Sequence, residues 1–211
     1  MGEIRDDHVE WEVVRRLKAM LEEPPKTTFN VTQSFALFSS ILLWSKNRAW
    51  VAGKHRVRGN WANPADHRAH DVREALHEKR ITEDPWCLSR QPPEVMLADH
   101  AGEHAVNADF AEMSAEDFFR SLRDALAHGD GRSIRPIHKL SRRHDTTLLA
   151  GFEIKIAGTN GAKEDLVLSL YSADIRRMGI ELADRFCQAL RGGDHHFEEE
   201  AGTDRIKEHA A

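Results

Sequence analysis

The apolar stretch from Phe35 to Trp44 limits the possible folds more than any other feature of the chain, and only Ser39 and Ser40 interrupt it. A membrane-spanning helix needs about 20 apolar residues, so this stretch is too short to be one. Its large apolar side chains recur at helical spacing. We therefore predict a helix over residues 32–48 at the centre of a hydrophobic core.

The chain as a whole has the composition expected of a cytoplasmic globular protein. Its 211 residues suffice for one domain, and 40% are hydrophobic and 31% charged. The charged N-terminus lacks the apolar core of a signal peptide. Cys87 and Cys187 match no metal-binding spacing, so we interpret them as buried or idle thiols in a reducing compartment. The net charge of -5 does not favour nucleic-acid binding by the chain as a whole.

The N-terminal half predicts two further helices. Apolar residues recur at helical spacing over 8–23, and Pro24 and Pro25 stop that helix. A polar helix is expected from about 68 to 79, after a loop over 49–65. Three prolines predict an irregular connection over 84–95.

The C-terminal half mixes helices with a hairpin. Ser114 and Asp117 fit a capping box at the start of a helix that runs to His128, and Gly129 ends it. Alternating apolar residues predict strands over 147–156 and 166–171, joined as a hairpin. A last helix begins at Ser172. Its apolar stripe is Ile175, Met178, Leu182, Phe186 and Ala189.

These elements predict a mostly α-helical fold, a single helical domain over 1–191 with a small β-hairpin before the C-terminal helix. Residues 192–211 are polar, and we expect a disordered tail.

The helix over 114–128 has two chemically different faces. At about 100° per residue, Phe118, Phe119 and Leu122 share a face with Ala125 and Leu126 and should point into the core. The opposite face carries Arg120, Arg123, Asp124 and His128. The carboxylate of Asp124 can reach either Arg120 or His128, which are four residues away on each side. That carboxylate and the C-terminal end of the helix dipole both favour a protonated imidazole.

This outer face suits cleavage of RNA without a metal ion. An imidazole can exchange protons with a ribose 2'-hydroxyl or with the leaving oxygen, and an arginine can stabilise the charge on the phosphate. Arg123 and His128 lie about 140° apart around the helix, so one chain makes a poor paired site. Two such helices at a two-fold axis would bring two arginines and two histidines together.

The segment RDALAHG, residues 123–129, resembles the motif of an arginine, a polar residue and a histidine that defines the HEPN superfamily. FNVTQSFALFSSILLWSKNR resembles the first core helix of one bacterial, often plasmid-borne, group of that superfamily, and SADIRRMGIELADRFCQAL resembles its C-terminal helix. The resemblance covers about residues 29–191.

The resemblance implies a helical bundle that dimerises through the motif helix and cleaves RNA without a cofactor or metal. Such proteins are often toxins of toxin–antitoxin or antiviral systems, so an antitoxin protein is a possible partner. It also implies that Arg123 and His128 are catalytic and that Asp124 orients them. Some relatives carry a tyrosine two residues after the histidine, which a partner nucleotidyltransferase modifies. Here that residue is Asp130, so the resemblance does not extend to this control.

Basic residues follow the motif. Residues 120–143 contain seven cations and two acids, and an excess of cations is typical of phosphate binding. Residues 46–58 hold five more cations. Trp50 and Trp61 lie beside them and could stack on bases, but tryptophans more often pack into a core. The expected RNA-binding residues are Arg120, Arg132, Arg135, Lys139, Arg142 and Arg143.

Two alternatives stay open. The same fold could bind RNA, a nucleotide or a protein partner without catalysis. His100, Glu103 and His104 spell an inverted zinc-protease pattern, but their segment contains Gly102 and has no apolar face to anchor it. Chance matches are expected among 13 histidines, so we expect no metal site.

Overall fold

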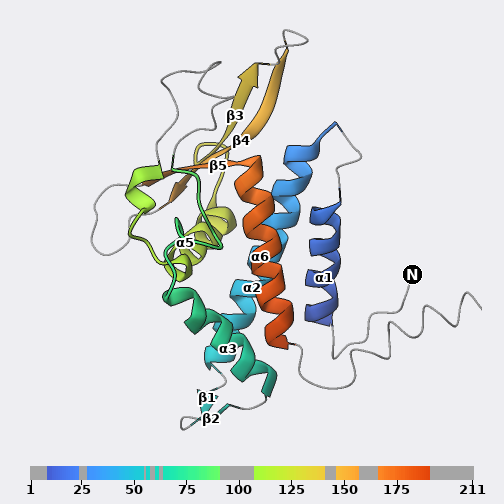
Figure 1. The fold of residues 1–211 in the computed structure, drawn as a ribbon, viewed down its shortest axis with the longest axis vertical. Coiled ribbons are helices and arrows are strands. Elements are labelled where there is room, and N and C mark those ends of the chain that lie inside the picture. Colours follow the sequence, from blue (N-terminus) through green and yellow to red (C-terminus); the bar gives the residue numbers. More distant parts are fainter. Residues whose placement is uncertain are drawn as a thin grey trace, which may run out of the picture.

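The fold is mostly helical with a small antiparallel sheet of three strands (Figure 1). The computed structural model describes residues 9–23, 28–54, 56–57, 60–61, 64–90, 107–140, 146–156 and 166–190, without the side chains of 49–66, 108 and 109. The long helices are α1 (Val9–Glu22), α2 (Asn30–Lys54), α3 (Pro64–His77), α5 (Ala115–His128) and α6 (Ser172–Leu190). Among the helices described, none is long and apolar enough to cross a membrane.

Helices α1, α2 and α6 lie side by side, and α3 and α5 pack against the same α2 (Figure 1). Phe38, Ile41 and Leu42 of α2 have no exposed surface, which confirms that the apolar stretch forms the centre of the core. The predicted stripe of α6 is confirmed for four of its five residues, because Ile175, Met178, Leu182 and Phe186 are buried in the same cluster, whereas Ala189 is half-buried outside it.

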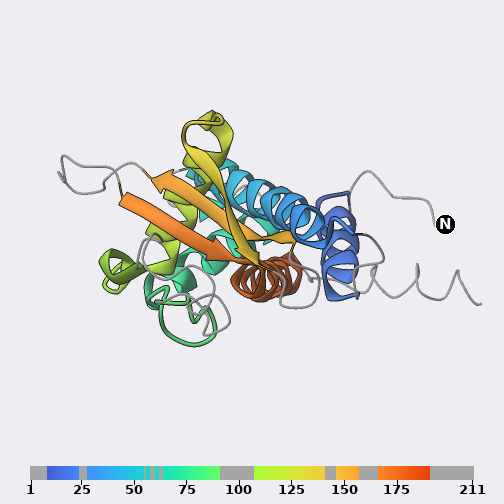
Figure 2. The ribbon, with the colours of Figure 1, turned by 90° about the horizontal axis from the view of Figure 1, so that it is seen from above.

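The sheet covers one end of this helical layer, as Figure 2 shows from above. Its strands are β3 (Ile134–Leu140), β4 (Thr147–Ile156) and β5 (Leu166–Tyr171), in the order β3-β4-β5. The bounds of β4 and β5 agree with the predicted hairpin. Strand β3 was not predicted, because Pro136 and the charged residues around it interrupt its apolar pattern. As an edge strand, β3 tolerates a proline that has no N–H to donate.

Two predicted boundaries between 48 and 68 were wrong. Helix α2 continues to Lys54, because no helix-breaking residue precedes Gly53. Helix α3 begins at Pro64, where a proline fits the first turn because its missing N–H would have no partner there. The expected loop is thus shorter and contains the two-residue strands β1 (Arg56–Val57) and β2 (Asn60–Trp61).

The other edge of the sheet is held by one side chain from a short 3-10 helix, η2 (Asn107–Phe110). The buried Asn107 accepts a hydrogen bond from the Ser169 backbone N–H at 2.9 Å and donates to the Ser169 carbonyl at 2.8 Å. It also donates to the carbonyl of Ser89 at 2.7 Å. Asn107 therefore links β5 to the irregular segment 80–90.

Candidate functional site

The N-terminal end of helix α5 is held by its N-cap residue and by a hydrogen bond to the segment that follows α3. The Ser114 hydroxyl accepts the Asp117 backbone N–H at 3.1 Å, which confirms the predicted N-cap. The Asp117 carboxylate accepts the Ser114 hydroxyl instead of completing the capping box at the Ser114 backbone N–H. The Ala115 backbone N–H donates to the Lys79 carbonyl at 2.8 Å. The start of α5 is therefore fixed to the chain after α3.

The inner face of α5 is the predicted one. Phe118, Phe119 and Leu122 have no exposed surface. The rings of Trp86 and Phe119 make a T-shaped contact with their centroids 4.8 Å apart. This packing sets the rotation of α5 and turns Arg120, Asp124 and His128 outward.

Arg123 and Asp124 form an ion pair on the outer face, with 3.0 Å between Nη2 and Oδ1. The side chain of Arg123 is 28% exposed and that of Asp124 is 51% exposed. The Nε atom of Arg123 is shielded from solvent and has no hydrogen-bond partner in the described part of the chain. Buried donors without partners are rare in folded proteins, so this N–H is an unsatisfied donor in the candidate site.

The other two residues of this face do not join that pair. Arg120 forms an ion pair with Asp117, so Asp124 does not hold it. His128 is exposed, and across the described residues its imidazole has neither a hydrogen bond nor an ion pair. One chain therefore presents an arginine–carboxylate pair and a separate histidine on the same surface.

Gly129 and Asp130 shape the turn after His128. Gly129 ends the helix as expected, but its φ of −72° is not left-handed. A Cβ at Gly129 would lie 2.4 Å from the Ala125 carbonyl oxygen, so close approach is the reason for a glycine. The Asp130 carboxylate accepts the backbone N–H of Arg132 at 2.8 Å. Hydrogen bonds from the Arg132 side chain and backbone lower the pKa of Asp130.

The structure does not gather all the expected RNA-binding cations. Arg135, Ile137 and Lys139 alternate on one face of β3, where Ile137 packs with Tyr171. Helix α5 packs on the opposite face of the sheet. The Arg132 guanidinium contacts Asp130 at 2.7 Å, and Arg142 and Arg143 lie outside the described residues.

The second basic group, residues 46–58, does not form a continuous phosphate-binding surface, because two of its five cations are in ion pairs. Lys46 is buried against Glu116, and the Nε of Arg48 contacts Glu10 at 2.8 Å. The side chains of Trp50 and Trp61 fall outside the described part, as do those of residues 54–58. The histidines at 100 and 104 and the tail also lie outside it. Neither Cys87 nor Cys187 forms a disulfide; Cys87 is exposed, and the Cys187 thiol donates to the Trp11 carbonyl at 3.9 Å.

Sequence reasoning missed the buried acid that supports α5. Glu116, in the first turn of α5, is 2% exposed and pairs with Lys46 of α2. The Arg73 Nε from α3 approaches the same carboxylate at 3.3 Å. An acid in a first helical turn is common, because it interacts favourably with the helix dipole. The position of Glu116 in the first turn therefore did not predict that its side chain is buried.

No family model, curated protein or solved structure matches the chain.

Proposed function

We propose that this protein is a metal-independent endoribonuclease of the HEPN type, active as a dimer whose α5 helices meet at a two-fold axis. The observation that carries the proposal is the outer face of α5. There a partly buried arginine with a shielded, unpartnered Nε lies beside an ion-paired carboxylate, on the same exposed surface as a histidine. The resemblance of residues 29–191 to HEPN proteins supports the same reaction.

The reaction needs a proton acceptor, a proton donor and a phosphate-binding cation. One His128 removes the proton from a ribose 2'-hydroxyl, and the 2'-oxygen attacks the adjacent phosphorus. The bond from phosphorus to the 5'-oxygen breaks, and that oxygen takes a proton from water, while the His128 imidazolium releases its proton to the solvent. Arg123 binds the phosphate as negative charge develops. The products are a 2',3'-cyclic phosphate and a 5'-hydroxyl.

Asp124 positions Arg123 in this proposal, and Arg120 adds positive charge beside it. RNA that crosses the edge of the sheet at β3 would reach Arg135 and Lys139. The proposed biological role is that of a toxin, held inactive by an antitoxin protein until it is released to cleave cellular RNA.

The test is cleavage of total cellular RNA in EDTA by the natural protein and by the His128→Ala and Arg123→Ala variants. We expect discrete fragments ending in 2',3'-cyclic phosphate, and a loss of at least about 100-fold in each variant. His77→Ala is the matched control, because His77 is also an exposed histidine in the last turn of a helix. Arg80→Ala is the control for Arg123, since Arg80 pairs with Glu112 on the surface.

Both controls should cleave like the natural protein, and DNA of the same sequence should stay intact because it lacks the 2'-hydroxyl. Cleavage that survives both α5 substitutions would exclude these residues. RNA binding without cleavage by a folded dimer would instead favour a catalytically inactive binding module.

A further inference from the structure

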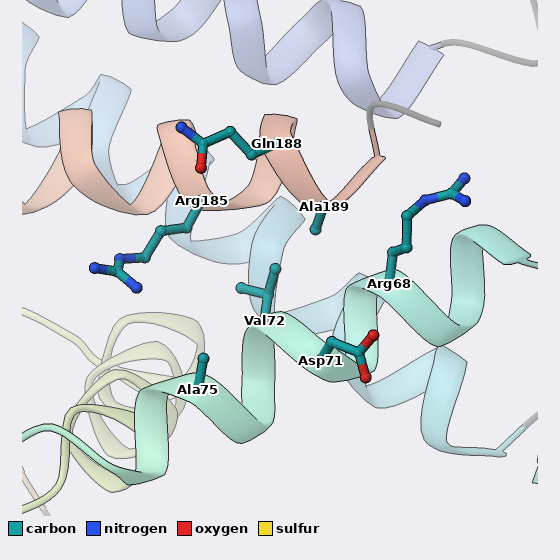
Figure 3. Close-up of a pocket in the computed structure, with 7 residues that line it drawn as sticks. All are labelled: Arg68, Asp71, Val72, Ala75, Arg185, Gln188 and Ala189. Carbon is teal, nitrogen blue, oxygen red and sulfur yellow. The ribbon is translucent and has the colours of Figure 1, made fainter. Parts of the chain in front are cut away.

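A groove of about 340 Å³ lies between α3 and α6, and none of the residues that line it belongs to α5. Figure 3 shows that its two sides run antiparallel, with Val72 and Ala75 from α3 facing Ala189 from α6. The floor is therefore apolar. Its volume lies within the range of about 300–1,000 Å³ that ligand sites occupy.

The two arginines lining the groove lie at its opposite ends (Figure 3). Arg68 has no hydrogen bond or ion pair among the residues described, and its Nε is shielded from solvent. Arg185 stacks over Trp86, with its Cζ 5.3 Å from the ring centroid. Its Nε donates to Glu181 at 2.6 Å, which leaves its terminal nitrogens without partners in the described part of the chain.

One acid also lines the groove. The Asp71 carboxylate contacts His67 Nδ1 at 2.9 Å on the same helix. An occupant with an apolar side chain between negative charges would match the floor and both arginines. Arg68 favours such an occupant, because its guanidinium has no acceptor among the described residues and gains a counter-charge on binding.

The chain itself carries such a segment a few residues beyond the groove. Residues 194–200 read DHHFEEE, with Asp194 before Phe197 and three glutamates after it. Helix α6 ends at Leu190, beside the end of the groove where Arg68 lies. Phe197 lies eight positions after Ala189, and eight Cα-to-Cα steps span at most about 29 Å, which is ample to turn back along two helical turns.

We propose that segment 194–200 folds back along the groove between α3 and α6. Phe197 covers Val72 and Ala75, Asp194 pairs with Arg68, and the glutamates after Phe197 pair with Arg185. This direction follows from where α6 ends, because the chain enters at the Arg68 end. The proposal is independent of catalysis at α5.

The test uses the full chain with the photoreactive residue benzoylphenylalanine in place of Phe197. After irradiation, mass spectrometry should place intramolecular cross-links on residues 68–75 and 185–189. Arg68→Glu and Arg185→Glu should each lower their yield about tenfold, because an attraction becomes a repulsion. Arg80→Glu, which changes a surface arginine elsewhere, should leave the yield unchanged. At 1 M salt, where the Debye length is about 3 Å, the yield should also fall.

A probe at Ile206 serves as the positional control and should give far fewer cross-links to these residues. Cross-links to the same groove that join two copies would replace the proposal with exchange of tails between protomers. Cross-links elsewhere, or yields that neither charge reversal changes, would overturn it.

Discussion

Lys46 of α2 and Glu116 of α5 form a buried ion pair, with the two residues 7% and 2% exposed. Burial lowers the pKa of the Lys46 ammonium, and the Glu116 carboxylate opposes that shift. Arg73 of α3 contacts the same carboxylate. The helix that carries Arg123 and His128 is therefore joined at its first turn to two other helices by charge.

Replacing Glu116 alone should lower the free energy of unfolding more than replacing Glu116 and Lys46 together. Glu116→Leu leaves the Lys46 ammonium buried without a counter-charge, and we expect a loss of about 3–5 kcal/mol in the free energy of unfolding. The double variant Lys46→Met/Glu116→Leu should be more stable than Glu116→Leu alone, because no unpaired buried charge remains. Urea denaturation of the natural protein, the two single variants Lys46→Met and Glu116→Leu, and the double variant measures these differences.

Arg73 is 35% exposed, so water can solvate its guanidinium once the acid is gone. If the two substitutions instead add without interaction, the pair would not be coupled as its geometry indicates.

Gly129→Ala should destabilise the protein, although its backbone angles suit any residue. The added Cβ would meet the Ala125 carbonyl oxygen at 2.4 Å and the Ile134 side chain at 3.0 Å, so the end of α5 must shift. We expect a loss of about 1–3 kcal/mol, typical of overpacking. Thermal unfolding followed by circular dichroism is the measurement.

Gly131→Ala is the matched control two residues later, because a Cβ there meets nothing within 4 Å. It should be neutral or stabilise the fold by up to about 1 kcal/mol, through a less flexible unfolded chain. Equal losses in both variants would contradict a specific contact at Gly129.

Local pattern was enough to predict five helical segments and two strands, because each carries its own periodicity. It was not enough for β3. In the sequence IRPIHKL the buried Ile137 follows Pro136, with Arg135 and Lys139 two residues away on either side, and pairing with β4 places Arg135 opposite Glu153 on the neighbouring strand. Such a strand is specified by its pairing with β4, and residues outside the strand's own sequence therefore decide that it forms.

The candidate site, too, could be predicted from the sequence only in part. Which residues of α5 face outward follows from helical spacing, and Phe118 and Phe119 are buried as that spacing requires. The partner of Asp124 does not follow from it, since packing brings the carboxylate to Arg123. The Lys46–Glu116 contact joins residues 70 positions apart, which periodicity within one helix cannot predict.

Asp174, which has no exposed surface, should make stability depend on pH with an identifiable sign. Burial raises the pKa of its carboxyl above the ordinary value of 3.8, although Ser89 and Arg177 oppose the shift. The folded state therefore holds the proton more tightly than the unfolded state. The contribution of this carboxyl is most favourable below pH 3.8 and is lost as pH rises through the folded-state pKa.

Asp174→Asn removes that titration while keeping an acceptor for the Ser89 hydroxyl, which lies 2.8 Å from the carboxylate. The stability of the variant relative to the natural protein should therefore increase from pH 4 to pH 7. The relative gain per pH unit is at most about 1.4 kcal/mol. Urea titrations at several pH values measure the difference. A difference that falls with pH would mean that Arg177 outweighs burial.

Mixing two inactive variants should restore cleavage if the site is shared between two α5 helices. A dimer of one Arg123→Ala chain and one His128→Ala chain has an intact Arg123 from one protomer and an intact His128 from the other. Each mixed dimer then contains one of its two composite sites intact. Random exchange of equal amounts makes about half the dimers mixed, so activity should recover to roughly a quarter of the natural value.

Each variant alone, and a mixture of Arg123→Ala with the Arg123→Ala/His128→Ala double variant, should stay inactive. RNA cleavage after unfolding and joint refolding is the measurement, with the dimer fraction determined by light scattering. If the natural protein cleaves RNA but the mixed dimers do not, each site draws its arginine and histidine from one chain, and α5 would have to bring them together without a partner.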